Sequence, residues 1–279
     1  MKIAYVILHY KVYSVTKECI EYLLKQNYEN YCVIVIDNHS DDGSYEKLKE
    51  EFGELDEVYL TSVEFNLGFA KANDLGYQIA KHRFEADIIV VMNNDVMISD
   101  TEFSTKLDVI AKSPGFDIMG PDIVNKVGDH QNPYVDYIKN KKGLDAYIRK
   151  LKIKKILLPF FYRFKKNHDI KHLRETKDHA CRQESVALHG ACLIFGINFV
   201  KKYEYPFYPE TFLYGEEDIL YFLAKKRGQV TLYCPDLVVH HMEDVSTNSI
   251  SKNRQEKRLF EISHTLDSLE ILRKLMKNG

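Results

Sequence analysis

The chain has 279 residues, of which 45% are hydrophobic and 29% are charged, and its formal net charge is −2. This composition is that of a soluble globular protein, and a chain of this length can bury a substantial core as one domain over residues 1–279. The longest apolar runs are far shorter than the roughly 18 residues that a membrane-spanning helix needs, and the first strand follows Met1 and Lys2 without a signal-peptide core. We therefore expect a cytosolic protein.

The first half of the chain alternates short aliphatic strands with helical segments. We predict a strand over residues 3–8, a helix over residues 15–26, a strand over residues 32–36 that ends in polar turn residues, and a helix over residues 45–52. Such alternation indicates βαβ units with right-handed crossovers. The expected fold class is α/β, with a Rossmann-like, mixed but mostly parallel central sheet flanked by helices.

The most informative stretch is an aliphatic run over residues 88–92 that ends in Asn93, Asn94 and Asp95. A buried parallel strand has such a run, and ligands bind beyond the carboxyl ends of the strands in open α/β sheets. Asp95 is therefore a candidate functional residue. An ordinary Asn/Asp turn after a buried strand explains the same residues equally well when the stretch is taken alone.

A basic segment follows in the middle of the chain. Residues 139–177 contain 14 Lys or Arg and only 3 acids, with aliphatic and aromatic residues between them. Such a segment can lie on an anionic bilayer, because cations meet lipid phosphates while apolar side chains enter the acyl boundary. A solvated helix or loop whose aromatic residues pack on the core is an equally good interpretation. Nucleic-acid binding is disfavoured, because the rest of the chain is net acidic and no known binding motif occurs.

Three consecutive acids, Glu216, Glu217 and Asp218, precede a predicted helix over residues 219–226 that ends before Gly228. Acids in a first helical turn complement the helix dipole, which explains one or two of them. Three adjacent carboxylates repel one another, which would raise at least one pKa and suit a general base.

Two adjacent histidines, His240 and His241, follow a predicted strand over residues 237–239. Neighbouring strand residues point to opposite faces, so only one of them is expected to enter a site. The last predicted element is a helix over residues 254–277, in which leucine and isoleucine recur at helical spacing and predict a buried face.

Six segments, in this order along the chain, together resemble the family 2 glycosyltransferases of the GT-A fold, especially bacterial rhamnosyltransferase-like and capsule-assembly members. The resemblance covers roughly residues 2–247 and rests on residues 33–44, 66–73, 93–95, 188–193, 212–218 and 235–241. It implies a nucleotide-sugar half over about residues 1–98 and an acceptor half over about residues 99–250. The acceptor half would contain the basic insertion 139–177, and residues 251–279 would form the C-terminal helix.

The resemblance also implies the chemistry: an inverting, metal-assisted transfer of a sugar from a nucleotide-diphosphate sugar to a hydroxyl of a saccharide acceptor. The acceptor would be lipid-linked, as in surface polysaccharide synthesis on the inner face of the cell membrane. The residues that correspond to donor-binding positions are Asp37, Asn38, Asn66, Gly68, Lys71, Asn73, Asn94 and Glu216.

The metal and the base are assigned by the same resemblance. Asn93 and Asp95 stand where the family has its DxD motif, and His241 fits the family's strand-end histidine better than His240, so these three residues are expected to hold Mn²⁺ or Mg²⁺. Asn93 departs from the motif, because an amide is a weaker ligand than a carboxylate. Alignment on the downstream leucine makes Glu217 the catalytic base, whereas the literal Glu-Asp pair selects Asp218; we prefer Glu217.

Two other functions remain open from the sequence. A nucleotidyltransferase also combines an α/β nucleotide domain with acidic metal ligands, but it usually carries a Gly-rich phosphate loop, and residues 9–14 contain no glycine. A non-catalytic sugar- or membrane-binding module of the same fold is the other alternative. The presence of Asp95, Glu217 and His241 argues against that module.

Overall fold

The computed structural model describes residues 1–112, 115–134, 138, 140–162, 178–242 and 254–277. Strands and helices alternate through the first half, as predicted. In chain order the elements are β1 (Ile3–His9), α1 (Tyr13–Leu23), β2 (Tyr31–Asp37), α2 (Ser44–Phe52), β3 (Val58–Ser62), α3 (Gly68–Gln78), the π-helical turn η1 (Ile79–Arg83), β4 (Ile88–Asn93), β5 (Val96–Met97), α4 (Phe103–Lys112), β6 (Ile118–Asn125), α5 (Lys141–Tyr162), β7 (Gln183–Glu184), β8 (Cys192–Phe195), α6 (Ile197–Lys202), α7 (Glu216–Lys226), β9 (Thr231–His241) and α9 (Arg254–Leu275).

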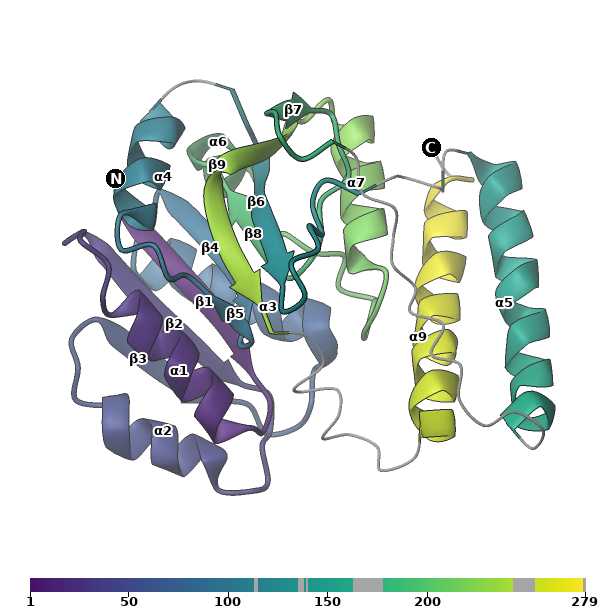
Figure 1. Cartoon of the computed structure of the whole chain (residues 1–279), viewed down its shortest axis with the longest axis horizontal. Helices are drawn as coiled ribbons and strands as arrows, with labels where there is room; N and C mark the ends of the chain where they lie inside the picture. The colour runs from purple at the N-terminus through teal and green to yellow at the C-terminus, as the bar shows by residue number, and fades with distance from the viewer. Residues whose placement is uncertain (113–114, 135–137, 139, 163–177, 243–253, 278–279) are drawn as a thin grey trace.

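Within these residues, nine strands form one mixed sheet in the order β3, β2, β1, β4, β8, β6, β9 and β5, with β7 also paired to β9 (Figure 1). Strands β1 to β4 are mutually parallel. Strand β8 runs antiparallel between β4 and β6, and β9 runs parallel to β6. The carboxyl ends of β1, β2, β4, β6 and β9 therefore lie at one edge of the sheet, which confirms the predicted mostly parallel α/β fold.

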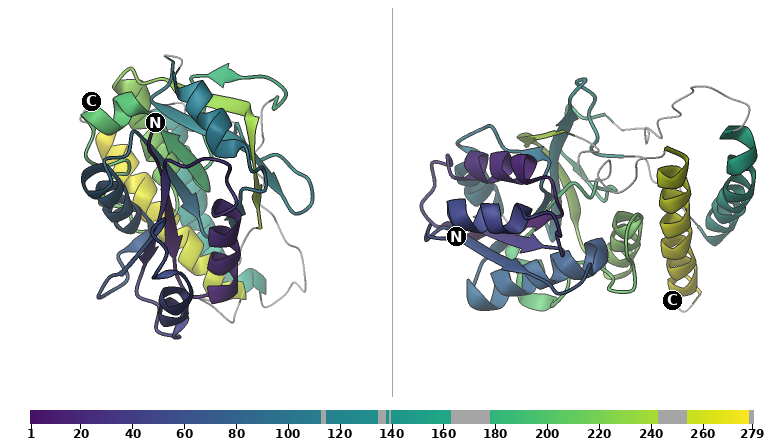
Figure 2. Two further views of the ribbon diagram at one scale, coloured as in Figure 1. Left: turned by 90° about the vertical axis from the view of Figure 1, so that its left-hand side faces the viewer. Right: turned by 90° about the horizontal axis from the view of Figure 1, so that it is seen from below.

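Alternating side chains divide each central strand between two cores. Tyr5 of β1 packs into a cluster with α1, α2 and α4, whereas its neighbour Val6 packs into a second cluster with α3, α6 and α7. Both side chains are fully buried. Helices therefore cover both faces of the sheet, as Figure 2 shows, and the strands have the continuous aliphatic character of a doubly covered parallel sheet.

Helices α5 and α9 form a further layer beside α7 (Figures 1 and 2). They run antiparallel, because Asp145 near the start of α5 pairs with Arg273 near the end of α9, and Lys155 further along α5 bonds Ser263. Their shared apolar cluster includes Leu144, Ile148, Leu151, Leu158, Ile219, Ile262, Leu266, Leu269 and Leu272. The predicted buried face of the C-terminal helix is thus confirmed.

Several element bounds differ from the prediction. Helix α1 begins at Tyr13 rather than at residue 15, and α7 begins at Glu216, directly after Gly215, which has a positive φ of 91°. The strand predicted over residues 237–239 extends from Thr231 to His241, because pairing with β6 continues on both sides of an irregularity near Pro121. No helix among the described residues is both long and apolar enough to cross a bilayer. The proposed division of the chain into halves stays a prediction.

Candidate active site

Asp95 and His241 lie side by side at the carboxyl edge of the sheet. Asp95 follows β4, and the antiparallel pairing of Val96 with His241 brings the two side chains together. The distance between Asp95 Oδ1 and His241 Nε2 is 3.4 Å, and the residues are only 5% and 8% exposed. The preceding residue, His240, is exposed on the other face of the strand.

A hydrogen bond between His241 Nδ1 and Gln131 holds the His241 ring in the orientation in which Nε2 faces Asp95. His241 Nδ1 lies 2.8 Å from Gln131 Oε1. With the amide assigned in this orientation its oxygen can only accept, so Nδ1 carries a proton, and Nε2 is the nitrogen that faces Asp95. Metal-binding histidines are oriented in the same way by a partner on the second nitrogen.

Asp95 and His241 match the needs of a divalent cation. Asp95 Oδ1 is buried and has no hydrogen-bond partner among the described residues, although a buried carboxylate oxygen normally has one. Carboxylate oxygens are ligands that Mn²⁺ and Mg²⁺ prefer, and an imidazole nitrogen is a common ligand of transition-metal ions. Residues 1–112, 115–134, 138, 140–162, 178–242 and 254–277 contain no group of three His, Cys, Asp or Glu side chains arranged for a metal, so further ligands would come from substrate phosphates and water.

Asn93, the third predicted metal ligand, ends strand β4. Its backbone N–H donates to the Ala191 carbonyl at 2.9 Å, and its side chain is half-buried at the sheet edge. The contribution of the Asn93 side chain to metal binding stays a prediction.

The three acids of α7 point in different directions. Glu216 is buried toward the Thr211 hydroxyl, and burial, reinforced by the neighbouring Glu217 charge, raises its pKa to about 8. Asp218 accepts a hydrogen bond from the Tyr134 hydroxyl at 3.3 Å. Glu217 faces Gly190, where a side chain added to the glycine would lie 3.9 Å from Glu217 Oε2. The helical spacing of 100° per residue separates carboxylates that are adjacent in the sequence.

The loop before β8 connects Glu217 to the Asp95 and His241 pair. The His189 ring lies edge-on to the His241 ring, with 5.8 Å between centroids. His189 Nδ1 accepts a hydrogen bond from the Ala191 N–H at 3.1 Å. His189 and Gly190 thus bring the strand-end pair and the first turn of α7 to one place at the edge of the sheet.

Sequence reasoning missed the segment over residues 131–134, which supports three site residues. Gln131 bonds His241, the Asn132 side chain accepts the His189 N–H at 2.7 Å, and Tyr134 bonds Asp218. Asn132 and Tyr134 are almost fully buried. No periodicity or motif marks this segment in the sequence; only its tertiary contacts identify it.

Asp37 ends β2 on the same edge of the sheet. Both of its carboxylate oxygens accept the Ser40 N–H at 3.2 Å, and burial raises the Asp37 pKa. Behind it lies His9, whose ring nitrogens bond Thr16 at 2.7 Å and Ser44 at 2.9 Å. Burial lowers the His9 pKa to about 4, so this histidine is neutral and joins β1, α1 and α2 beneath Asp37. The sequence assigned no role to His9.

Asn38, Asn66 and Gly68 form one hydrogen-bonded corner between β2 and α3. Asn38 accepts the Leu67 N–H at 2.8 Å and donates to Asn66 Oδ1 at 3.0 Å, while Asn66 Oδ1 accepts the Gly68 N–H at 2.9 Å. Gly68 has a φ of 77°, and a Cβ there would lie 2.4 Å from the Phe212 carbonyl oxygen. The backbone of Phe212, in the loop before α7, is thus the group that approaches Gly68 closely.

The remaining predicted donor residues lie around this corner. Lys71 is exposed on the first turns of α3. Buried Asn73 donates to the Phe69 carbonyl at 3.0 Å, and its Oδ1 has no partner among the described residues. Asn94 turns back to α1, where its amide donates to Thr16 Oγ1 at 2.9 Å. Their contacts with a nucleotide sugar stay predictions.

The family model described as glycosyl transferase family 2 matches residues 5–179, which is more than half of the chain. A search of curated proteins finds no match. The fold is similar to that of several solved structures. One is GalNAc-T7 crystallised with UDP, GalNAc and Mn²⁺, with a TM-score of 0.58, 15% identity and coverage of 86% of this chain and 44% of that chain.

Two further solved structures have similar folds. TarS of S. aureus, residues 1–349, aligns with a TM-score of 0.56 and 13% identity over 98% of this chain and 73% of that one. The mannosyltransferase PcManGT of Pyrobaculum calidifontis, in complex with GDP-Man and Mn²⁺, aligns with a TM-score of 0.55 and 12% identity over 100% of this chain and 76% of that one. At these identities the likeness shows a shared GT-A fold.

Proposed function

The chain belongs to glycosyl transferase family 2, and from that premise we propose that it is an inverting enzyme that transfers a sugar from a nucleotide-diphosphate sugar to a hydroxyl group of a saccharide acceptor. The observation that carries this proposal is the pair of Asp95 and His241 at the carboxyl edge of the sheet, with 3.4 Å between Asp95 Oδ1 and His241 Nε2. Neighbouring residues His189 and Gly190 contact His241 and Glu217 respectively.

In this proposal, Asp95 and His241 hold the cation, with Asn93 as a weaker neighbour. A cation held there would supply positive charge to offset the negative charge that develops on the leaving diphosphate. Support comes from the buried, unpartnered oxygen of Asp95 and from the Gln131 bond that orients His241. The GalNAc-T7 and PcManGT structures, which hold Mn²⁺ with a nucleotide or nucleotide sugar, are consistent with such a role.

Glu217 is the proposed base. It takes the proton of the acceptor hydroxyl, the acceptor oxygen forms a bond to the anomeric carbon from the side opposite the diphosphate, and the bond between that carbon and the diphosphate oxygen breaks. The nucleoside diphosphate leaves with the electron pair, and the anomeric configuration is inverted. Glu217 is favoured over Asp218 as the base because Asp218 accepts a hydrogen bond from the Tyr134 hydroxyl. Glu217 instead faces Gly190, the neighbour of His189.

The donor end of the proposed site is the β2 edge with Asp37 and the corner made by Asn38, Asn66 and Gly68. Asp37 would accept hydrogen bonds from the base or ribose. Lys71, Asn73, Asn94 and Glu216 complete the proposed donor set. TarS has been crystallised with UDP-GlcNAc and PcManGT with GDP-Man, so the fold alone does not select a nucleotide.

The proposed acceptor is a lipid-linked saccharide in the synthesis of a bacterial surface polysaccharide such as a capsule, with rhamnosyl transfer among the expected reactions. That acceptor would place the enzyme in the cytoplasm, peripherally on the inner face of the cell membrane. The basic helix α5 is the element that supports this location.

The experiment that tests the proposal compares two acids of one helix. Donor binding is first found by thermal stabilisation with UDP-, GDP-, dTDP- and CDP-sugars in the presence of Mn²⁺. With the donor that binds, Glu217→Gln is expected to retain donor affinity and to lose about 10²- to 10⁴-fold in turnover, the usual worth of a general base. Asp218→Asn is the matched control and should retain most of the activity.

Two results would contradict this assignment. If Asp218→Asn is the inactive variant and Glu217→Gln is active, the base is Asp218 and the proposed geometry is wrong. If both variants transfer sugar at nearly the parental rate, the acids only cap α7. Absence of stabilisation by every nucleotide sugar would argue for a non-catalytic module.

A further inference from the structure

Helix α5 carries an exposed apolar strip on the side away from α9. Leu144, Ile148 and Leu151 are buried toward α9, whereas Ile153 and Leu157 are 58% and 41% exposed. Ile153 and Leu157 are four residues apart and so lie above one another on one helical face. Clusters of exposed aliphatic side chains on a soluble protein mark interaction surfaces.

The strip lies within a strongly basic helix. Residues 141–162 contain seven Lys or Arg and one acid, in a chain whose net charge is −2. Arg149 and Lys150 are exposed on the turn that precedes the strip, and neither has an acidic partner among the described residues. The surface therefore combines aliphatic side chains with cations that are available to an external anion.

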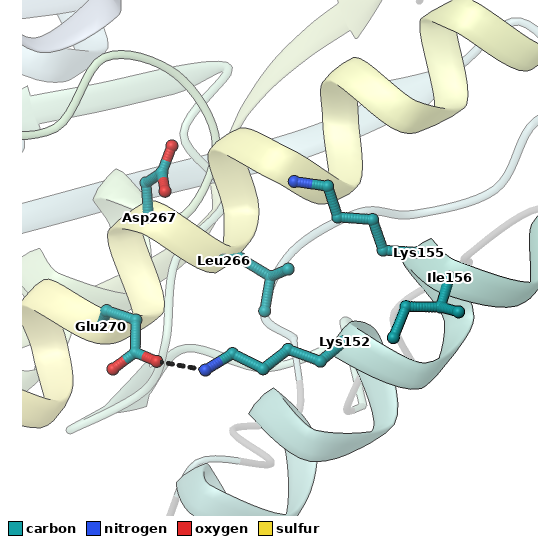
Figure 3. A pocket seen from close by; sticks show the side chains of 6 residues that line it. All are labelled: Lys152, Lys155, Ile156, Leu266, Asp267 and Glu270. Carbon is teal, nitrogen blue, oxygen red and sulfur yellow. Dashed lines mark hydrogen bonds and ion pairs between the residues drawn. The ribbon is translucent and has the colours of Figure 1, made fainter.

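The groove between α5 and α9 shows which cations are already used within the protein. It has a volume of about 460 Å³ and is lined by Lys152, Lys155, Ile156, Leu266, Asp267 and Glu270. Figure 3 shows Lys152 reaching across it to Glu270, at 2.8 Å, and Lys155 bonds Ser263 at 2.8 Å. These lysines hold the two helices together, so they are poor probes of an external partner.

We propose that the outer face of α5, made by Arg149, Lys150, Ile153 and Leu157, docks onto an anionic lipid bilayer. Cations at the surface of an anionic membrane attract its headgroups, and aliphatic residues of an amphipathic helix enter the boundary between headgroups and acyl chains. Two copies of this chain would not pair through the same face, because equal clusters of positive charge would meet.

The outer face of α5 lies at the periphery of the molecule (Figures 1 and 2). The second half of α5, which carries the strip, and the carboxyl ends of β1, β6 and β9 lie toward the same end of the molecule, the lower end in Figure 1. Helix α9 lies between α5 and the rest of the molecule in both figures, so the outer face of α5 is turned away from the sheet and is open to an external partner. The docking face deepens the peripheral membrane location proposed above, but it does not depend on the transfer reaction.

The test is sedimentation of the full chain with phosphatidylcholine vesicles, with and without phosphatidylglycerol. The parent is expected to bind only the anionic vesicles tightly, and to bind them more weakly at high salt. Each cation near the surface strengthens binding about fivefold, so the double variant Arg149→Gln, Lys150→Gln should bind about 25-fold more weakly. The double variant Ile153→Ser, Leu157→Ser should lose at least about tenfold through the removed apolar contact.

Matched controls separate docking from a general loss of charge or hydrophobicity. Lys201→Gln with Lys202→Gln removes two exposed cations from α6, and Val109→Ser removes an exposed aliphatic side chain from α4, which is 61% exposed. Both controls should bind like the parent. Circular dichroism and thermal melting of each variant establish that it is folded.

Three outcomes would overturn the proposal: no binding of the parent to anionic vesicles, equal losses in the control variants, or tighter binding of the same face to single-stranded RNA or an acidic protein than to vesicles. The assay contains no donor or acceptor. A failure here would therefore leave the proposed transferase reaction standing, and failure of the transferase test would leave docking standing.

Discussion

Burial of Glu216 at the start of α7 predicts a pH dependence of the free energy of unfolding. Glu216 is 4% exposed, its Oε1 has no partner among the described residues, and burial raises its pKa from 4.5 to about 8. The neutral acid is thus favoured in the folded protein. Stability from this group is fully present below pH 4.5, where the folded and unfolded chains are both protonated, and it is lost as pH rises toward 8.

The substitution Glu216→Gln removes this titration while keeping the size of the side chain. The Thr211 hydroxyl donates to the Tyr208 carbonyl at 2.9 Å and lies beside the Glu216 carboxyl group, so the glutamine of the variant keeps the same polar neighbour. Linkage between pKa values of 4.5 and about 8 changes the free energy of unfolding by about 4 kcal/mol between pH 5 and pH 8.5. The variant should therefore gain about that much stability relative to the parent over this range.

Urea denaturation of the parent and of Glu216→Gln at pH 5, 6.5, 7.5 and 8.5 measures this difference. Because both proteins share every other titrating group, the difference between their free energies of unfolding isolates Glu216. Glu217→Gln is the control, since the Glu217 side chain is more exposed and should not change the pH dependence to the same degree. A difference that stays constant from pH 5 to pH 8.5 would refute the assignment of a protonated Glu216.

Two further predictions concern the metal pair and the corner at α3. Asp95→Ala should abolish the tightening of nucleoside diphosphate binding by Mn²⁺ while leaving the fold intact, as measured by calorimetry with and without the cation; unchanged metal-dependent affinity would remove Asp95 from the site. Gly68→Ala should destabilise the protein by about 3 kcal/mol or more, because it adds a contact with Phe212 to a strained positive φ. Gly128→Ala, with a φ of 87° and open space around it, should cost about 1 kcal/mol in urea denaturation; equal losses in the two variants would show that the Phe212 contact has no effect.

Local patterns in the sequence were sufficient for the fold class and for four of the strands. The aliphatic runs of β1, β2 and β4 identify the strands, because side chains buried on both faces leave a continuous apolar signal. Asp37, Asp95 and His241 follow strand ends, and the carboxyl ends of parallel strands meet at one edge of a sheet, so their common location could be inferred without coordinates. The order of six short motifs indicated the family, which the family model confirms.

The sequence alone left the directions of the three consecutive acids undetermined, because side chains that are adjacent in the sequence point to different sides of a helix. The structure buries Glu216, directs Asp218 to Tyr134 and leaves Glu217 facing Gly190. Likewise, the glycine at position 68 predicts a close backbone approach, but only the packing of the loop before α7 identifies Phe212 as the group that approaches.

Local patterns thus determined β1, β2, β4, part of β9 and the helices α1, α2, α7 and α9, since each of these elements depends on residues within a few positions of one another. The tertiary structure decided which side chains meet across long sequence separations: Gln131 with His241, Asn132 with the His189 backbone, and α5 with α9. Basic and apolar residues alternate along α5 in the sequence, yet which of them are covered by α9 and which face outward depends on a helix more than 100 residues away. Contacts of that range leave no local periodic signal.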